Sequence, residues 1–373
     1  MSPHPVIEWT EAGEIRHARW RSEAALPPPK KVIVADDTIS ADSAYKLVCE
    51  GTALLWRGDF HNAKQLVQAL ARRVDRKPPK KGANATEAFH FHRQAQGQRA
   101  RILGMVLIPF EAGATIPLRR APEVRQACCE VWGEAEEACV TSLRELLGLI
   151  GAHEWRRKGV EIQALGKTIH PYYGVFSPIR GEYIELIAKA PLADQALAFD
   201  IGTGTGVLAA LLAYRGIPRI VATDQDPRAL ACARENIANL GFSPRVEVVE
   251  ADLFPAGRAP LIVCNPPWLP ARPSSPVEAA IYDPDSKMLK GFLAGLTDHL
   301  SPGGEAWLIL SDLAELLGLR TREEFETWVD QAGLRILGRL NARPNHPKAS
   351  DPKDPLHAAR SREITSLWRL AAK

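Results

Sequence analysis

The spacing of apolar residues changes along the chain and divides it into three parts. Residues 1–35 are rich in proline, including the run at 27–29, and we expect a loosely ordered segment there. From 36 to 158 apolar residues recur at helical spacing, and one such face comprises Ala63, Leu66, Val67, Leu70 and Val74. Further helices are predicted over 86–104 and 122–149, the second with Pro122 in its first turn. The second part is therefore predicted to be a mainly helical accessory domain.

From residue 159 to 373, short apolar runs alternate with helical periodicity. The pattern predicts strands at 197–201, 219–223, 246–250, 261–264, 305–310, 334–340 and 364–370, and helices at 178–190, 206–215, 227–240, 285–300 and 312–332. Such alternation is typical of a mostly parallel sheet with helices on both faces. Only a loop, residues 341–363, separates the last two strands, so we expect them to pair antiparallel. This loop is either a substrate-docking element or a disordered excursion. The predicted fold class is α/β, with a Rossmann-like sheet.

Composition and charge add a candidate partner. Apolar residues make up 46% of the chain and charged residues 24%, which is ordinary for a soluble protein. There is no apolar run of eighteen residues, no signal-peptide core and no cysteine pattern at metal-ligand spacing, so we expect a cytoplasmic protein without a metal. The net charge is +3, yet residues 61–101 contain ten basic and two acidic side chains. This excess indicates either contact with a polyanion such as RNA or the ribosome, or a solvated helix face.

A glycine-rich turn follows the first strand of the predicted sheet. It reads Asp200-Ile-Gly-Thr-Gly-Thr-Gly206 and opens a helix, so the backbone can approach a ligand closely. Val207 stands where a dinucleotide-binding turn needs its third glycine, which disfavours an NAD-dependent oxidoreductase. An acidic residue before the glycines suits a cofactor with a cationic sulfonium. Asp224 ends the next strand, where its carboxylate can accept the ribose hydroxyls of a nucleoside cofactor. Asp252 ends the third strand, where its side chain and Leu253 can meet the adenine of that cofactor. The candidate cofactor residues are Asp200, Gly202, Thr203, Gly204, Gly206, Asp224, Asp252 and Leu253.

A second motif, Asn265-Pro266-Pro267-Trp268, follows the predicted strand at 261–264. An amide or ring-attached amine is a poor nucleophile because its lone pair is delocalised, and acceptors for its N–H hydrogens concentrate electron density on nitrogen. The Asn265 side chain and the Pro266 carbonyl offer two such acceptors, and consecutive prolines hold the backbone in place. Trp268 can stack on a planar acceptor. These four residues are the candidate catalytic residues.

The two motifs, in this order and spacing, resemble the class I S-adenosylmethionine-dependent methyltransferases that act on amide or exocyclic amine nitrogens. Two other segments are similar to HemK-like glutamine methyltransferases of the "methyltransferase small" superfamily: 176–182, where Ile179 is an extra residue, and 278–288. Trp268 replaces a more usual tyrosine. The resemblance covers roughly 160–340 and implies S-adenosylmethionine as cofactor.

The resemblance leaves the acceptor open. The HemK-like segments favour a glutamine side-chain amide in a translation protein, whereas the basic residues 64–101 favour an exocyclic base amine in ribosomal or transfer RNA. A third possibility, of another class, is an adaptor that binds the cofactor and RNA or protein without catalysis. The intact Asn265–Trp268 motif argues against an adaptor, which has no need of nitrogen acceptors.

Overall fold

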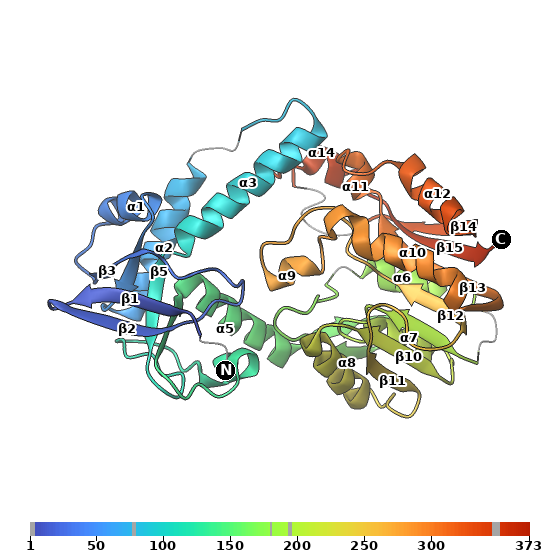
Figure 1. Ribbon diagram of the computed structural model, residues 1–373, viewed down its shortest axis with the longest axis horizontal. Helices are drawn as coiled ribbons and strands as arrows, with labels where there is room; N and C mark the ends of the chain where they lie inside the picture. The colour runs from blue at the N-terminus through green and yellow to red at the C-terminus, as the bar shows by residue number, and fades with distance from the viewer. Residues whose placement is uncertain (1–3, 77–79, 180, 193–195, 345–350) are drawn as a thin grey trace. The chain divides into compact units, whose positions relative to one another are not determined.

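Two compact units make up the chain, and each contains its own β-sheet (Figure 1). The computed structural model describes residues 4–76, 80–179, 181–192, 196–344 and 351–373. The first unit comprises residues 1–81 and 90–154, and the second comprises 82–89 and 155–373. Arg180 of the HemK-like segment, Lys77 of the basic stretch and residues 345–350 of the long loop lie outside the described residues.

The first unit is built on a six-stranded sheet with the order β1-β2-β6-β5-β4-β3. Its strands are β1 (Val6–Glu11), β2 (Glu14–Trp20), β3 (Lys31–Ala35), β4 (Thr52–Trp56), β5 (Val106–Phe110) and β6 (Cys139–Ser142). Strands β3, β4 and β5 run parallel, and β6 runs antiparallel to β5. Ala53, Leu55 and Leu107 are fully buried at its centre.

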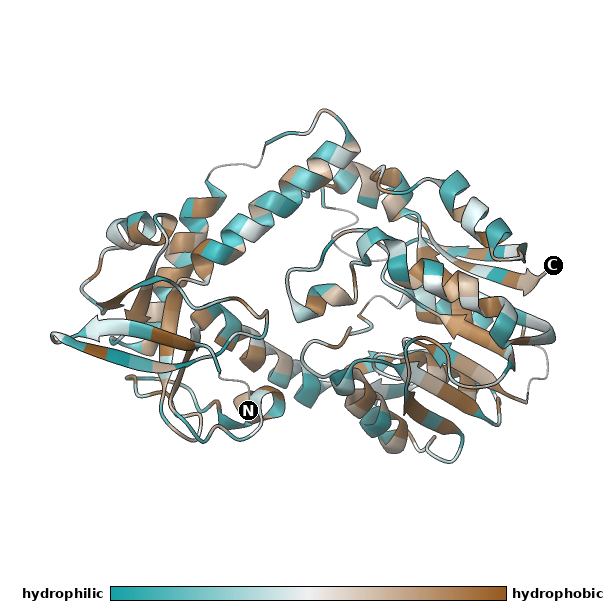
Figure 2. Cartoon of the chain, viewed as in Figure 1, coloured by the Kyte–Doolittle hydropathy of each residue, from teal (hydrophilic) through white to brown (hydrophobic). Residues whose placement is uncertain are grey.

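The described part of residues 4–158 contains the helices α1 (Ala41–Cys49), α2 (Phe60–Asp75), α3 (Ala85–Leu103), α4 (Arg125–Trp132) and α5 (Leu143–Lys158). Helix α3 begins in the second unit, and α5 ends in it. The predicted amphipathic face is confirmed in α2, where Ala63, Leu66 and Leu70 are buried. Helix α3 starts and ends one residue before its prediction. Most of α3 is hydrophilic, whereas β4 and β5 are apolar (Figure 2).

Two predictions for this region are wrong. Residues 1–35 are not loosely ordered, because β1, β2 and β3 lie there and pair within the sheet. The helix over 122–149 is instead α4, then β6, then α5. Strand β6 lies between β2 and β5, and its pairing with β2 joins residues about 120 positions apart. The accessory region is therefore α/β rather than mainly helical, because sheet partners this remote leave no local periodicity.

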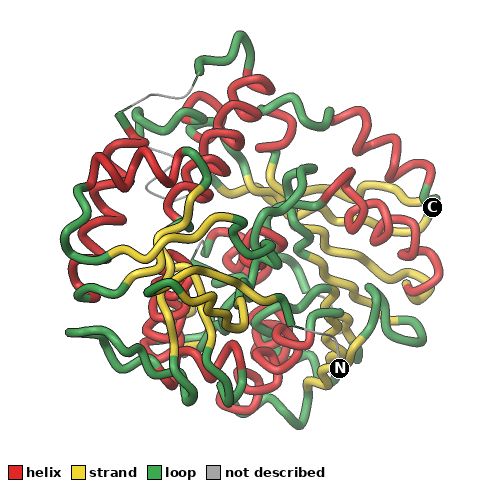
Figure 3. The backbone as a smooth tube through the Cα atoms, turned by 60° about the vertical axis from the view of Figure 1, so that its left-hand side comes forward, coloured by secondary structure: helices red, strands yellow, loops and turns green. Residues whose placement is uncertain are grey.

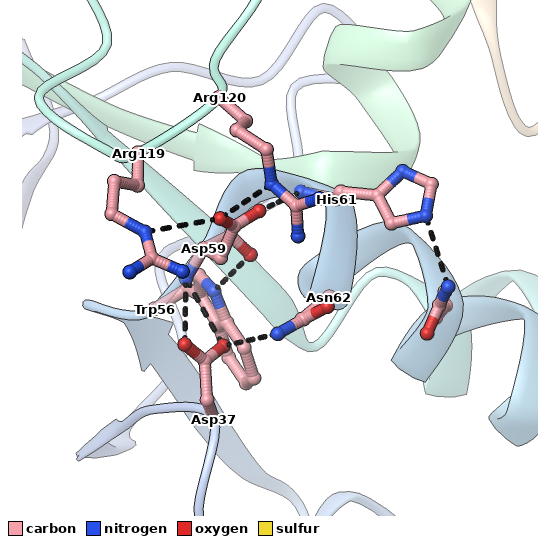
Figure 4. Close-up of polar contacts among 8 residues, drawn as sticks. Asp37, Trp56, Asp59, His61, Asn62, Arg119 and Arg120 are labelled. Atoms are coloured by element: carbon pink, nitrogen blue, oxygen red, sulfur yellow. Dashed lines mark hydrogen bonds and ion pairs between the residues drawn. The ribbon is translucent and has the colours of Figure 1, made fainter.

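A buried carboxylate organises the carboxyl ends of the parallel strands in this sheet (Figure 4). Asp59 follows β4 and caps α2, accepting the N–H of His61 at 2.9 Å. Its other oxygen accepts the Nε–H groups of Arg119 at 3.2 Å and Arg120 at 2.7 Å. The Arg120 hydrogen bond is the largest influence on the Asp59 carboxyl and outweighs its burial, so the pKa falls to about 2. Asp59 thus ties the β4–α2 turn to the loop that follows β5.

The second unit contains a seven-stranded sheet with the order β11-β10-β9-β12-β13-β15-β14. Its strands are β9 (Ala198–Ile201), β10 (Ile220–Asp224), β11 (Val246–Glu250), β12 (Ala259–Cys264), β13 (Leu300–Ser311), β14 (Leu334–Ala342) and β15 (Thr365–Ala372). The first five are parallel, and β15 runs antiparallel between β13 and β14. The predicted Rossmann-like sheet and its antiparallel final pair are confirmed. A separate hairpin, β7 (Val160–Ile162) with β8 (Lys167–Ile169), precedes the sheet.

Helices lie against this sheet, as Figure 3 shows in red beside the yellow strands. From residue 182 onwards the described helical segments are α6 (Glu182–Lys189), α7 (Val207–Tyr214), α8 (Pro227–Asn239), α9 (Pro276–Ala279), the 3-10 turn η1 (Pro284–Ser286), α10 (Lys287–His299), α11 (Leu313–Leu316), α12 (Arg322–Gln331) and α14 (His357–Arg360). Of these, α6, α7, α8, α10 and α12 contact the strands, whereas α14 packs against α11. Seven of the eight residues of α7 are buried. The predicted helix over 312–332 is interrupted at 317–321, where Thr321 begins α12 with a capping box. No helix within the described ranges is long and apolar enough to cross a bilayer.

We expect Asp59→Asn to lower the melting temperature of the protein, because an amide supplies no charge for the two arginines. Since the pKa of Asp59 is depressed in the folded protein, its contribution to stability is present above the usual carboxyl pKa of 3.8 and is lost as the pH falls towards 2. Circular dichroism melts between pH 7 and pH 2 test both expectations. Asp36→Asn is the matched control, because Asp36 is exposed and its side chain bonds to nearby Thr38. Equal melting of the two variants would contradict this role of Asp59.

Candidate active site

The strand order places one edge of the second sheet at a topological switch point. From β9 the chain moves outward to β10 on one side, and later returns to place β12 on the other side of β9. Ligands of open α/β sheets bind outside the carboxyl ends of the strands at such a point. The glycine-rich turn follows β9 and the Asn-Pro-Pro-Trp motif follows β12, so both predicted motifs belong to this edge.

Positive backbone angles explain the glycines of the turn. Gly202, Gly204 and Gly206 have φ of 69°, 55° and 80°, a region that residues with a Cβ adopt at a cost. A Cβ on Gly202 would lie 2.7 Å from the Met288 Cε, and one on Gly206 would lie 3.3 Å from the Ala233 backbone. A Cβ on Gly204 would meet nothing within 4 Å. The turn is thus closed on the side of α8 and open at Gly204.

Asp200 holds this turn from inside the protein. Its side chain is buried, and its Oδ2 accepts the Thr203 hydroxyl at 2.6 Å and the Ala209 N–H at 3.1 Å. Burial raises the pKa of Asp200 to about 6, although both hydrogen bonds oppose the rise. A buried carboxylate that is destabilised in its charged form is a favourable partner for a cationic ligand group.

Hydrogen bonds join the ends of three neighbouring strands. The Thr203 N–H donates to the Thr223 carbonyl at 2.8 Å, and the Thr223 hydroxyl donates to the Leu253 carbonyl at 2.6 Å. Asp224 Oδ2 accepts the Gly204 N–H at 3.0 Å. Burial raises the pKa of the Asp224 carboxyl. Six of the predicted cofactor residues therefore take part in the hydrogen bonds at these strand ends: Asp200, Thr203, Gly204, Gly206, Asp224 and Leu253.

The turn after β11 is shaped by α10. Leu253 has a positive φ of 68°, and its side chain lies beside Gly291, where a Cβ would come within 2.9 Å of it. The next residue, Phe254, lies similarly against Gly295 and stacks on His299 with ring centroids 4.4 Å apart. Asp252 is exposed and makes no hydrogen bond with the residues that the structure describes. Leu253 is therefore held by packing, and Asp252 projects from the same turn.

The second motif forms a hydrogen-bonded unit after β12. The indole N–H of Trp268 donates to the Asn265 Oδ1 at 3.0 Å. A carbonyl oxygen has two lone pairs, so Asn265 keeps capacity for one further donor. Pro266 is buried, while Pro267 and Trp268 are partly exposed. Trp268 also packs against the hydrophobic clusters on the two faces of the sheet. Trp268 thus sets the orientation of the Asn265 amide, through a hydrogen bond that was not predicted from the sequence.

Comparison with known proteins agrees with this geometry. The family described as the methyltransferase small domain matches residues 182–315. The release factor glutamine methyltransferase of Cereibacter sphaeroides is 41% identical over 125 residues, which cover 32% of this chain and only 41% of that protein. The tRNA1(Val) (adenine(37)-N6)-methyltransferase of Shewanella loihica is 31% identical over 201 residues, covering 48% of this chain and 83% of that protein. The chain belongs to the methyltransferase small family.

Two of the solved structures to which this chain is similar are described as methyltransferases. One from Pyrococcus furiosus has a TM-score of 0.41 and 18% identity, covering 60% of this chain and 98% of that one. An S-adenosylmethionine-dependent methyltransferase from Thiobacillus denitrificans in complex with S-adenosylhomocysteine has a TM-score of 0.36 and 14% identity, covering 51% and 90%.

S-adenosylmethionine is the cofactor of the methyltransferase small family, and the residues at the switch point fit it. The backbone is open at Gly204, where no side chain would obstruct a ligand. The carboxylates of Asp200 and Asp224 supply negative charge for a cationic ligand, and the Asp224 carboxylate as a whole retains acceptor capacity beyond the backbone N–H groups of Gly204, Gln225 and Asp226. Among the described residues, no group of three or more His, Cys, Asp or Glu could hold a metal ion.

Several residues that support this candidate site were not predicted from the sequence. Met288 lies against Gly202, and Gly291 admits Leu253. Asn236 is buried and joins the Thr205 carbonyl to the His170 N–H at 3.0 and 2.8 Å. The glycines of α10, four residues apart on one face, were the available signal. Met288 and Asn236 carry no such signal, because their partners come from distant segments.

Asp200→Asn should stabilise the ligand-free protein at pH 7 and weaken its binding of S-adenosylhomocysteine. The folded pKa of about 6 exceeds the usual 3.8, so wild-type stability falls as pH rises through this window. A pKa difference of this size corresponds to roughly 3 kcal/mol. The neutral amide of the variant removes this pH dependence of stability. Loss of a charged hydrogen-bond partner should reduce the affinity for S-adenosylhomocysteine about tenfold or more.

Urea unfolding between pH 4 and 8, with calorimetric titration of S-adenosylhomocysteine, measures both effects. Asp226→Asn is the control, because Asp226 is exposed and caps α8. If Asp200→Asn proved less stable than wild type at pH 7, with unchanged pH dependence, the assignment of a strained buried carboxylate would be wrong.

Proposed function

We propose that this protein methylates an exocyclic amine of a base in RNA, using S-adenosylmethionine. The observation that carries the proposal is the Asn265–Trp268 unit after β12, which offers hydrogen-bond acceptors to a planar nitrogen. An RNA acceptor is supported by the relatives that are at least 30% identical to this chain and that it matches over most of their length. Two of these, at 83% and 78% of their length, are tRNA1(Val) (adenine(37)-N6)-methyltransferases. An RNA acceptor also fits a cytoplasmic location.

The residues of the motif would act on the nitrogen and its hydrogens. S-adenosylmethionine, when bound, supplies an electrophilic methyl group on a sulfonium. The Asn265 Oδ1 and the Pro266 carbonyl accept the two N–H hydrogens, which directs the nitrogen lone pair away from the ring and towards the methyl carbon. Trp268 holds the Asn265 amide in place through its indole N–H. Pro266 and Pro267 keep the backbone from rearranging, so these acceptors are preorganised before the substrate arrives.

A glutamine side-chain amide in a translation protein is the second candidate. The 41% identity to the release factor glutamine methyltransferase of Cereibacter sphaeroides favours it, although that match spans 125 residues. An amide nitrogen presents the same two N–H hydrogens as a base amine, so the Asn265 mechanism serves both. The two candidates differ in what surrounds the reacting group. An RNA brings phosphates, and a protein brings a peptide backbone.

Some of the basic residues in the first unit support an RNA partner, whereas others are paired with carboxylates. Within the described portion of 64–101, Arg73 forms an ion pair with Asp42 at 2.7 Å and Arg99 with Asp75 at 2.9 Å. Those two charges are therefore partly neutralised by the fold. Other basic side chains of the region, including Arg72, Arg76, Lys80, Lys81 and Arg101, are exposed. We propose that this exposed group contacts RNA.

Asn265→Ala should reduce turnover roughly a hundred- to thousandfold, which corresponds to about 3–4 kcal/mol for one preorganised hydrogen-bond partner. Binding of S-adenosylhomocysteine should stay close to wild type, because the side chain acts on the acceptor nitrogen rather than on the cofactor. Single-turnover kinetics and calorimetry separate these effects. Asn239→Ala, at the exposed end of α8, is the control for substitution of an asparagine. Turnover of Asn265→Ala within a few-fold of wild type would refute the nitrogen-acceptor mechanism.

Reversing Arg72 and Arg76 to glutamate should weaken RNA binding and reduce the slope of log affinity against log salt by about one to two. The control carries the same change of charge on the second unit, at exposed Lys189 and Arg219. Filter binding of transfer RNA over a salt series measures both quantities. An equal loss of RNA affinity in both variants would show an effect of net charge alone and would contradict the proposed RNA-binding surface.

A further inference from the structure

Two neighbouring arginines of the first unit share one buried carboxylate and extend from it to the surface (Figure 4). Arg119 and Arg120 each donate an Nε–H to the same oxygen of Asp59, at 3.2 and 2.7 Å. The Asp59 side chain has no exposed surface, whereas 80% of the Arg119 side chain and 59% of the Arg120 side chain are exposed. The negative charge therefore lies inside the fold, and the two positive charges lie on its surface.

Each of these guanidinium groups uses only its Nε–H in the contact with Asp59. The terminal Nη groups of Arg119 and Arg120 make no hydrogen bond or ion pair with any residue that the structure describes. By contrast, Arg57 of the same unit places both Nε and Nη2 on Glu11, at 2.8 and 2.7 Å. Arg119 and Arg120 are thus fixed at Nε and keep their outer donors for a ligand, which reduces the entropy that binding costs.

The backbone of this loop is also held in a defined conformation. The Arg119 carbonyl accepts the N–H of Phe60, the first residue of α2, at 2.9 Å. Arg120 has a φ of 55°, a left-handed conformation that a residue with a Cβ adopts at a cost. Strained residues of this kind are found preferentially at ligand sites. The conformation of Arg120 therefore agrees with a binding role for its side chain.

The arginines lie at the edge of the first sheet where ligands of α/β sheets bind, outside the carboxyl ends of parallel strands. Asp37 follows β3, Asp59 follows β4, and the two arginines lie in the loop after β5. A Cβ on Gly58 would overlap the Asp37 side chain, unlike one on Gly204 in the second unit, which would meet nothing. The turn after β4 is therefore closed to a nucleoside, and a ligand at this edge meets the exposed guanidinium groups.

One exposed carboxylate in the same turn opposes an anionic ligand. Asp37 accepts the Asp59 N–H and the Asn62 Nδ2–H, each at 3.0 Å. Its charge also acts on Arg120. An amide at position 37 would keep an acceptor for these donors and remove the charge, so this residue provides a test in which affinity for an anion should rise.

We propose that Arg119 and Arg120 bind neighbouring phosphates of the acceptor RNA. The proposal rests on the proposed function of RNA base methylation and adds an anchor to the exposed basic group that includes Arg72 and Arg76. The planar guanidinium fork matches two phosphate oxygens. Because both arginines meet one oxygen of Asp59, their guanidinium groups lie close together and suit neighbouring phosphates. Such contacts position a nucleic acid without reading its sequence.

Arg119→Gln and Arg120→Gln, made singly, each leave one arginine on Asp59, so both variants should melt closer to wild type than Asp59→Asn does. Each should bind unfractionated transfer RNA roughly tenfold more weakly and reduce the slope of log affinity against log salt by about 0.7 to 0.9. Arg120→Lys should keep the slope and lose part of the affinity, because an ammonium keeps the charge but not the fork. Filter binding over a salt series gives both quantities.

Two residues at the turn between β1 and β2 provide matched controls, since Arg16 and Glu14 are exposed and paired with each other at 2.6 Å. Arg16→Gln should bind transfer RNA within about twofold of wild type, with an unchanged salt slope. Asp37→Asn should bind it severalfold more tightly, whereas Glu14→Gln should not. Wild-type affinity and slope in both Arg119→Gln and Arg120→Gln, or an equal loss in Arg16→Gln, would overturn the proposal.

Methylation kinetics distinguish a failure of this anchor from a failure of the proposed function. With RNA as acceptor, Arg119→Gln and Arg120→Gln should raise KM for RNA and leave turnover at saturating RNA unchanged, the reverse of Asn265→Ala. RNA that is methylated with a wild-type KM by both arginine variants would overturn the anchor and leave the proposed function intact. RNA that binds through these arginines but is never methylated would contradict the proposed function. Binding of polyglutamate, rather than RNA, through the two arginines would overturn the anchor in favour of an acidic protein.

Discussion

The hydrogen bonds that tie the ends of β9, β10 and β11 are the constraint on which the site depends. The Thr203 N–H bonds to the Thr223 carbonyl, and the Thr223 hydroxyl bonds to the Leu253 carbonyl. Inside this tie, Asp200 is buried with its pKa raised to about 6. The fold therefore keeps an ionisable group where it reduces stability. Such a group is retained where a ligand uses its charge, and here the turn it supports is open at Gly204.

The Asn265–Trp268 motif and the segment after it are also held in place by hydrogen bonds within the fold, before a substrate binds. Trp268 orients the Asn265 amide, and Asp283 joins the following segment to the start of α10. Met288, in the first turn of that helix, lies against Gly202. Helix α10 thus links the acceptor motif to the glycine-rich turn. This link explains how two motifs about sixty residues apart are held at one edge of the sheet.

The spacing of apolar residues was sufficient to predict the strands of the second sheet, but it did not predict those of the first. Strands β9 to β12 are buried parallel strands with continuous apolar runs, and helices separate most of them, so their periodicity is visible in the sequence. In the first unit β2 is mostly exposed, and the four-residue β6 pairs with it across about 120 residues. Neither leaves a local signal. The candidate site shows the same difference. The glycine-rich turn and Asn265 were predicted from motifs, whereas the hydrogen bond from Trp268 to Asn265 depends on a contact that only the fold creates.

We propose that the Asn265–Trp268 unit presents a base amine in RNA to the methyl group of S-adenosylmethionine. The most direct measurement incubates the protein with a cell extract and S-adenosylmethionine labelled on the methyl group, and then treats the labelled macromolecules with ribonuclease or with protease. We expect ribonuclease to release the label and protease to leave it in place, and digestion to nucleosides should yield a base methylated on its exocyclic nitrogen. Label that is released by protease and resists ribonuclease would contradict it.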